Sequence, residues 1–192
     1  MNIPLLPLHT VLFPGGVLPL RIFEPRYLDM ISTCLRESSP FGVCLIRAGQ
    51  ETGLAASTCE VGTLVRISWF ERRPDGLLGI DVDGVQRFRI LQSAVQNDQL
   101  ILANIELLAD EPACAMPAEW QSLVSLLQTM LAQLQFPYAR LTPRYDDAVW
   151  VSARLAELLP LKLELKQALL QTDDPLLRLQ KLQAAIEAGD FS

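Results

Sequence analysis

Histidine and lysine are scarce in this 192-residue sequence, and their scarcity excludes several kinds of catalytic site. His9 is the only histidine, so a metal site with several imidazole ligands is excluded. His9 lies in a strand-like segment, and we predict a structural role for it. The three lysines, at positions 162, 166 and 181, have no serine in a recognisable catalytic context beside them. A Ser–Lys dyad therefore has no candidate pair.

Excess positive charge and phosphate-binding motifs are also lacking. The net charge is −6 at pH 7, whereas affinity for nucleic acids and anionic membranes depends mainly on clustered lysine and arginine. No GxxxxGK[ST] segment is present, so a nucleotide site of the Walker type is excluded. We therefore expect no nucleic-acid partner, no membrane partner, no metal and no cofactor.

Targeting segments and cysteine motifs are missing as well. The amino-terminus has no basic region followed by an apolar one, as a secretory signal would have. The apolar stretch Val11–Leu20 is interrupted by two prolines and two glycines, and it is shorter than the roughly 20 residues that span a bilayer. We expect a cytoplasmic location. The four cysteines form no CxxC pair, and we predict buried free thiols rather than disulfides.

The sequence is nevertheless rich in apolar residues, which make up 50% of the chain and predict a conventional packed core. Apolar residues mostly alternate before Glu111 and recur at helical spacing after it. Pro112 and Pro117 are typical of a linker followed by a helix start. We predict an α+β fold with two parts, a β subdomain of residues 1–111 and an α-helical subdomain of residues 112–192.

The first part is predicted to contain several short strands and one helix. The strands are Ile3–Val11, Phe41–Arg47, Val61–Phe70, Leu77–Val82, Val85–Leu91 and Gln99–Leu107. Pro74-Asp75-Gly76 is expected to form a turn, because proline presets φ and glycine accepts a positive φ. Asp83-Gly84 is expected to form a two-residue hairpin turn. The helix, Pro25–Arg36, would place four residues on one face, namely Tyr27, Met30, Ile31 and Cys34. This pattern favours a small barrel or a folded-over sheet.

The second part is predicted to be helical. Its helices are one that Pro117 opens, one from about Asp147 to Pro160, one that includes Leu165–Thr172 and one that begins at Pro175. Asp146 and Asp174 are expected to cap the second and fourth helices, and Gly189 suits the end of the fourth. Leucine stripes on these helices predict the inside of a bundle. A membrane-surface helix is the alternative, but the polar faces lack a basic bias.

The segment FPGGVLPL, residues 13–20, is the best candidate for an interaction site. Its two prolines donate no hydrogen bond, so it is poorly suited to a central strand. Some of its apolar surface would then stay exposed, and exposed patches tend to mark interaction sites. The alternative is that the segment folds inward and fills the barrel. The proposed contacts are Phe13, Pro14, Val17 and Leu18, joined by Trp69 or Phe70. Trp69 lies on the apolar face of its strand and is expected to be buried, which leaves Phe70 facing outward.

Other charged residues are explained by local structure. Asp81 and Asp83 would flank the Asp83-Gly84 turn and be solvated. Arg72-Arg73 would lie at the tip of a solvated loop, although two arginines could also bind a carboxylate or a phosphate.

Three separated blocks resemble the amino-terminal substrate-recognition domain of Lon proteases. The first block is similar to that family's V-x-F-P-G, P-L and E-x-R-Y elements, the second to its V-G-T and G-x-x-R-F strands, and the third to its L-P, K-Q-x-L-L and R-L elements. The matching residues are Val11, Phe13, Pro14, Gly15, Pro19, Leu20, Glu24, Arg26 and Tyr27, then Val61, Gly62, Thr63, Gly84, Arg87 and Phe88, then Leu159, Pro160, Lys166, Gln167, Leu169, Leu170, Arg178 and Leu179.

This resemblance implies a pseudo-β-barrel of the PUA-like kind with one inserted helix, followed by an α-helical bundle. It also implies recognition of unfolded or tagged proteins or peptides. No ATPase or peptidase segment precedes Ser192, so we expect a binding module without enzymatic activity. Two alternatives remain open. One is an RNA-binding PUA-like protein, and the other is a small-molecule binder or enzyme that uses a groove between barrel and bundle.

Overall fold

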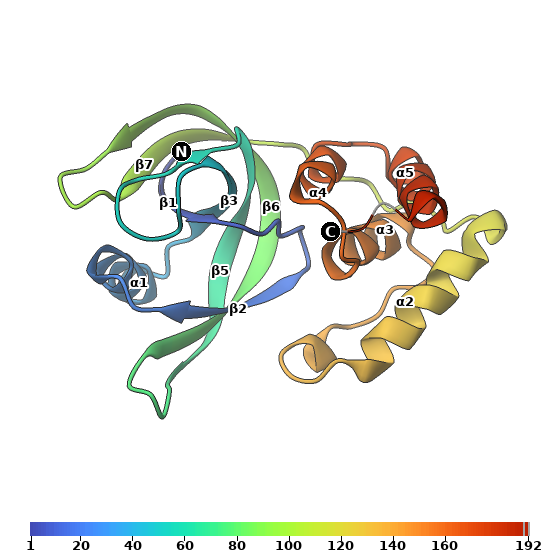
Figure 1. The fold of residues 1–192 in the computed structure, drawn as a ribbon, viewed down its shortest axis with the longest axis horizontal. Coiled ribbons are helices and arrows are strands. Elements are labelled where there is room, and N and C mark those ends of the chain that lie inside the picture. Colours follow the sequence, from blue (N-terminus) through green and yellow to red (C-terminus); the bar gives the residue numbers. More distant parts are fainter. Residues whose placement is uncertain (190, 192) are drawn as a thin grey trace. The chain divides into compact units, whose positions relative to one another are not determined.

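The computed structural model describes residues 1–189 and 191, which divide into two compact units. The β unit spans Met1–Ala109 and the helical unit spans Asp110–Ser192 (Figure 1). The fold is α+β, as predicted: a β-sheet with one inserted helix is followed in the chain by further helices. No helix in the described part of the chain is long and apolar enough to cross a membrane.

The sheet of the β unit bends over into a pseudo-barrel. Its strands are β1 (Asn2–Leu8), β2 (Val17–Ile22), β3 (Phe41–Ala48), β4 (Ser57–Thr58), β5 (Val61–Arg72), β6 (Leu78–Val95) and β7 (Ile101–Leu107). The order is β1-β7-β6-β5-β3-β4, with β1 also pairing β3 in parallel and β2 pairing β6. It is not a closed barrel: β2 and β4 lie outside the main ring of pairings, and the register shifts in three pairs of strands.

The predicted hairpin turn at Asp83-Gly84 is wrong, because β6 runs through both residues as one long strand. Its register with β5 shifts at this point, where Leu64 pairs with Gln86 and Val65 with Gly84. Val85 is thus the extra residue of a β-bulge. Gly84 does not form a turn but allows the backbone of residues 13–16 to approach β6 closely. Its N–H donates to the Gly16 carbonyl at 2.9 Å, and its carbonyl accepts from the Gly15 N–H at 2.8 Å.

The turn at Pro74-Asp75-Gly76 is confirmed, and it joins β5 to β6. Gly76 has a φ of 84°, a value that glycine adopts without steric cost. The Asp75 carboxylate accepts a hydrogen bond from the Leu77 N–H at 3.0 Å. β5 extends two residues beyond its predicted end at Phe70.

Helix α1 (Pro25–Glu37) is inserted between strands β2 and β3, and one of its faces packs in the core of the β unit. The four predicted residues on that face, Tyr27, Met30, Ile31 and Cys34, are all buried. They pack in one cluster with residues of the surrounding strands, among them Leu6, Ile22, Phe41, Val65, Ile80 and Val82. The helix therefore packs its apolar face against the strands, as its periodicity predicts.

The helical unit contains α2 (Gln121–Gln133), α3 (Ala148–Leu158), α4 (Leu163–Leu170) and α5 (Pro175–Ala188), and the 3₁₀ turns Ala118–Trp120 and Tyr138–Arg140. The N-cap of α3 is Asp147 rather than the predicted Asp146, because the Asp147 carboxylate accepts from the Val149 N–H at 3.0 Å. The predicted caps of α5 are confirmed. Asp174 accepts from the Leu176 N–H at 2.8 Å, and Gly189 adopts a φ of 64°.

All four cysteines are free thiols, as predicted, but only Cys34 and Cys44 are buried, so the expected burial is wrong for Cys59 and Cys114. Burial raises the pKa of the Cys44 thiol strongly, and it raises the pKa of Cys34 as well. We expect a maleimide reagent at pH 7.5 to modify half-buried Cys59 and Cys114 in the native protein but not Cys34 and Cys44, because the two buried thiols are inaccessible to the reagent. Mass mapping of labelled peptides checks this expectation. Rapid labelling of Cys44 without denaturant would contradict its buried position.

Candidate binding surface around β2

The segment proposed for binding is divided between the interior and the surface. Phe13 is only 1% exposed, and Val17 is also buried, so neither side chain is available to a partner in this structure. The alternative, that the segment folds inward, therefore describes these two residues. Pro14 and Leu18 are half-buried. From Val17 onward the chain is not a loop but strand β2, which pairs with β6 alone among the described strands. Pro19 is accommodated because β2 lies at an edge.

The end of the β5–β6 hairpin forms an exposed arm, which we define as residues 68–81. Figure 1 shows it in teal and green, extending away from the rest of the sheet. Phe70 is 58% exposed, as predicted, but Trp69 is also 39% exposed, so its expected burial is wrong. The register of β5 with β6 shifts between Ile67 and Trp69, which interrupts the simple alternation of the strand. The end of the arm also extends past the core, so residues 68–72 are all exposed, although Ile80 and Asp81 at its base are buried.

Asp81 is buried within this arm, which corrects the expectation of a solvated acid at a turn. It lies near the start of β6, between Trp69 on β5 and Pro19 on β2, with which it pairs. The Ser68 hydroxyl donates to the Asp81 carbonyl at 3.2 Å and to the Asp83 carboxylate at 3.1 Å. These bonds hold the bulged part of β5 against β6.

The registers place Phe70 and Leu20 in one row across three strands. Phe70 pairs with Ile80, and Ile80 pairs with Leu20. Residues paired in this way point to the same side of a sheet, and the outer two lie about 10 Å apart, two strand spacings. Ile80 is buried, Leu20 is half-buried and Phe70 is exposed. The inner face of the sheet thus emerges from the core into solvent at Phe70.

Next to β2 lies a groove of about 270 Å³, which we call the β2 groove. Three separate segments line it, namely the end of β1, the stretch from β2 into α1, and the loop before β4. Its lining residues are Leu6, Pro7, Leu8, Pro19, Leu20, Arg21, Ile22, Phe23, Glu24, Tyr27, Glu51 and Thr52. Phe23, missed in the sequence analysis, is 54% exposed at its rim. The sequence could have indicated Phe23, because it is an aromatic residue in the short connection between strand β2 and the N-cap of α1.

A buried ion pair holds one wall of the groove. Arg26 contacts Glu24 at 2.6 Å, and both side chains are largely buried. Arg26 also donates to the Gly53 carbonyl at 2.7 Å, and Glu24 accepts from the Gly53 N–H at 2.8 Å. The two residues therefore fix the loop that carries Glu51 and Thr52. Arg26 lies over the Tyr27 ring, 4.6 Å from its centroid. Burial raises the pKa of Tyr27, although the Arg26 charge acts in the opposite direction.

His9 borders the same loop and is exposed rather than part of the interior. Its backbone N–H donates to the Glu51 carboxylate at 2.7 Å, and its Nδ1 lies 3.5 Å from the same oxygen. These contacts connect the end of β1 to the groove wall, which is a structural role.

At the tip of the arm, Arg73 lies 3.8 Å from Asp75, so an ion pair within the turn engages one of the two adjacent arginines. The described residues include no group of three or more His, Cys, Asp or Glu that could hold a metal ion.

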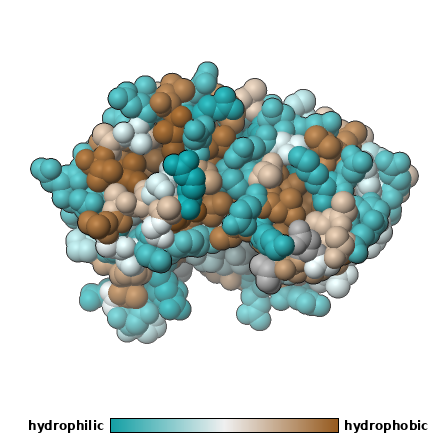
Figure 2. Space-filling model, turned by 45° about the horizontal axis from the view of Figure 1, so that its top comes forward, coloured by the Kyte–Doolittle hydropathy of each residue, from teal (hydrophilic) through white to brown (hydrophobic). Residues whose placement is uncertain are grey.

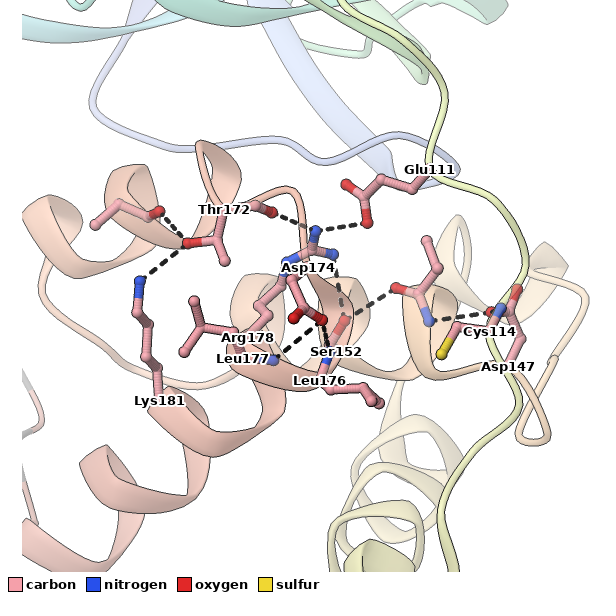
Figure 3. Close-up of polar contacts among 12 residues, drawn as sticks. Glu111, Cys114, Asp147, Ser152, Thr172, Asp174, Leu176, Leu177, Arg178 and Lys181 are labelled. Carbon is pink, nitrogen blue, oxygen red and sulfur yellow. Dashed lines mark hydrogen bonds and ion pairs between the residues drawn. The ribbon is translucent and has the colours of Figure 1, made fainter.

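The helical unit contains a second polar cluster, centred on Arg178 (Figure 3). Arg178 is 1% exposed and donates to Glu111 at 2.6 Å, to the Thr172 carbonyl at 2.8 Å and to the Ser152 hydroxyl at 3.2 Å. Lys181 donates to the Thr172 hydroxyl at 3.1 Å. The cluster joins α3, the α4–α5 connection and α5 to the chain segment at Glu111. Because Arg178 is buried, we assign the cluster a structural role in the helical unit and not that of an accessible binding site.

The surface carries several apolar patches. Figure 2 shows hydrophobic residues gathered in separate groups among hydrophilic ones, rather than in one continuous apolar face. Around β2 and the arm, the largest exposed apolar side chains are Phe23, Trp69 and Phe70. This geometry suits the binding of apolar side chains from another chain at several small contacts.

The comparisons with known proteins decide the family. The family model of the ATP-dependent protease La (LON) substrate-binding domain matches residues 2–188. The chain belongs to the Lon substrate-binding domain family. A solved structure of a Lon N-terminal domain protein from Xanthomonas campestris is 38% identical, has a TM-score of 0.79, and is matched over 96% of this chain and 98% of that one.

Curated Lon proteases are similar over part of their length. The Lon protease of Dictyoglomus thermophilum is 25% identical over 194 residues, which cover 94% of this chain and 23% of that protease. The Lon protease of Anaeromyxobacter dehalogenans is 34% identical over 110 residues, which cover 56% and 13%. The chain thus spans less than a quarter of these relatives, and the match lies in the Lon substrate-binding domain.

The residues that match the Lon family motifs largely maintain the fold. Glu24 and Arg26 hold the wall of the β2 groove, Gly84 permits the close approach of residues 13–16, and Arg178 ties the helices together. Phe88 is fully buried in the core of the β unit. These motif residues therefore identify the family through its fold, and they do not indicate a binding surface.

Proposed function

We propose that this chain is a non-catalytic, cytoplasmic module that binds exposed apolar segments of unfolded or tagged proteins. Its family supports a role in substrate recognition. The observation that carries the proposal is the emergence of the inner sheet face into solvent at Phe70, two strands from the β2 groove. Exposed apolar surface of this kind is unfavourable in water unless a partner covers it.

Exposed aromatic residues are efficient contacts for this role. They bring a large apolar area and lose little conformational entropy when they bind. Phe70 on the arm and Phe23 at the groove rim flank the half-buried Leu20, and Leu18 and Pro14 extend the surface along β2. The proposed contacts are therefore Pro14, Leu18, Phe23 and Phe70.

Replacing Phe70 with serine is expected to weaken binding of an unfolded protein about tenfold, because an exposed aromatic contact is lost while the core is untouched. The probe is a fluorescently labelled, reduced and carboxymethylated protein, and fluorescence anisotropy gives its dissociation constant. Leu91 is the matched control, since it is also 58% exposed in the β unit but lies on β6 away from the arm.

The Leu91→Ser variant should bind like the wild type, and both variants should melt within a few degrees of it, because exposed substitutions change stability little. Equal binding by the wild type and Phe70→Ser would remove the arm from the binding surface. No binding of unfolded proteins by the wild type at all would overturn the proposed function.

A further inference from the structure

Strand β2 uses only one of its two edges. Among the described strands it pairs with β6 alone, from Val17 opposite Asp83 to Ile22 opposite Leu78. In an antiparallel pair, the backbone groups of successive residues point alternately toward the partner strand and away from it. One set of β2 backbone groups is therefore directed away from β6.

The hydrogen bonds beside the strand identify that set. The Gly84 N–H donates to the Gly16 carbonyl at 2.9 Å, so that carbonyl points toward β6, and the Val17 N–H of the same trans peptide points away from it. By alternation, Leu18, Leu20 and Ile22 also point toward β6, whereas Val17, Pro19 and Arg21 point away. Pro19 fits this assignment, because a proline in a strand is tolerated where its missing N–H faces an edge. The outer edge thus offers two donors, the N–H groups of Val17 and Arg21, and three carbonyl acceptors.

Space for another strand lies against this edge. The β2 groove is lined by Pro19, Leu20 and Arg21 on one side and by Leu6–Leu8 of β1 on the other. β1 pairs with β3 over Leu5–Leu8, but its pairing with β7 ends at Leu5. The groove is therefore a gap in the pseudo-barrel between two strands that each lack a neighbour there, and its lining is mostly apolar.

We propose that an extended segment of a partner protein adds to the outer edge of β2 as a further strand and fills the β2 groove. This inference rests on the proposed function and specifies how the partner is held. An extended chain supplies the backbone acceptors and donors that the edge lacks, whereas a helix has already used its own. Alternate side chains of the segment point to the apolar lining formed by Leu20, Phe23 and Tyr27.

Charge at the rim of the β2 groove favours an acidic residue in the bound segment. Arg21 is exposed and has no acidic partner in the described part of the chain, while the groove carboxylates Glu24 and Glu51 are engaged by Arg26 and His9. An acidic residue in the bound segment would complement Arg21. The occupant is thus an extended, apolar segment with an acidic residue near one end.

The test removes one backbone donor without changing the pairing to β6. The probe is a fluorescein-labelled peptide of alternating valine and threonine, with or without a terminal aspartate, and anisotropy gives its affinity. Arg21→Pro deletes the outward N–H together with the arginine side chain, and it is expected to weaken binding of the neutral peptide roughly three- to tenfold, the effect of one hydrogen bond. Arg21→Ala keeps that N–H and should bind the neutral peptide like the wild type. It should lose the small, salt-sensitive advantage of the aspartate peptide.

A second measurement covers the case in which Arg21→Pro does not fold. N-methylation of alternate residues of the peptide should abolish binding to the wild type for one alternating set and spare it for the other. Unchanged affinity with Arg21→Pro and with both methylated sets would overturn strand addition. Binding of unfolded proteins but not of the peptide would also overturn it and would leave the proposed function standing. Failure of the wild type to bind either would contradict both.

Discussion

Replacement of Arg178 by methionine is expected to lower the free energy of unfolding of the helical unit by about 3–5 kcal/mol, the cost of breaking a buried ion pair by removing one partner. The Arg178 guanidinium contacts the Glu111 carboxylate at 2.6 Å, and both side chains are almost inaccessible to water. Methionine fills much of the same volume but satisfies neither Glu111 nor the Thr172 carbonyl and Ser152 hydroxyl, which now accept from Arg178 (Figure 3).

Urea unfolding followed by circular dichroism at 222 nm measures this effect, because the helical unit dominates that signal. Arg144→Met is the matched control. Its guanidinium lies 3.6 Å from Asp147 but is 57% exposed, and exposed pairs contribute about 0–1 kcal/mol. A second substitution, Glu111→Leu, should recover part of the loss in Arg178→Met, since it removes the stranded carboxylate. Equal unfolding midpoints for Arg178→Met and Arg144→Met would contradict a stabilising role for the cluster.

Much of the fold follows from patterns that are local in the sequence. The apolar face of α1 and the caps of α5 depend on residues within about four positions of one another, so periodicity and capping chemistry predict them. The Asp83-Gly84 error shows where such patterns fail. Asp-Gly is typical of a hairpin turn, but here the glycine faces residues 13–16, which lie about 70 positions earlier. A local pattern carries no information about a contact of that kind.

The candidate site was predictable only in part, for the same reason. FPGGVLPL and Phe70 both lie at the surface assigned to binding, but alternation could not tell which of their side chains are covered. Phe13 and Val17 are buried by neighbours that the sequence does not reveal, and a register shift exposes Trp69. The β2 groove itself joins the end of β1, β2 and the loop around Glu51, and it exists only because the sheet bends.

Substitution of Gly84 by alanine is expected to destabilise the β unit by about 2–3 kcal/mol, a typical cost of forcing a methyl group into a packed interior. A Cβ at this position would lie far closer than 3.0 Å to the Phe13 carbonyl oxygen, which is backbone and cannot rotate away. The strand would have to separate from residues 13–16, with loss of the hydrogen bonds to Gly15 and Gly16. Differential scanning calorimetry should show the melting temperature falling by roughly 5–10 °C.

The chain offers a matched control five residues away on the same strand. A Cβ at Gly79 would meet the flexible side chains of Arg73, at 3.2 Å, and Glu71, at 3.5 Å, so Gly79→Ala should change the melting temperature by no more than about 2 °C. Because residues 13–16 lead directly into β2, Gly84→Ala should also weaken binding of unfolded proteins, whereas Gly79→Ala should not. If the two variants melted together, Gly84 would not be the point at which the 13–16 segment is held, and β2 would owe its position to its ladder with β6 alone.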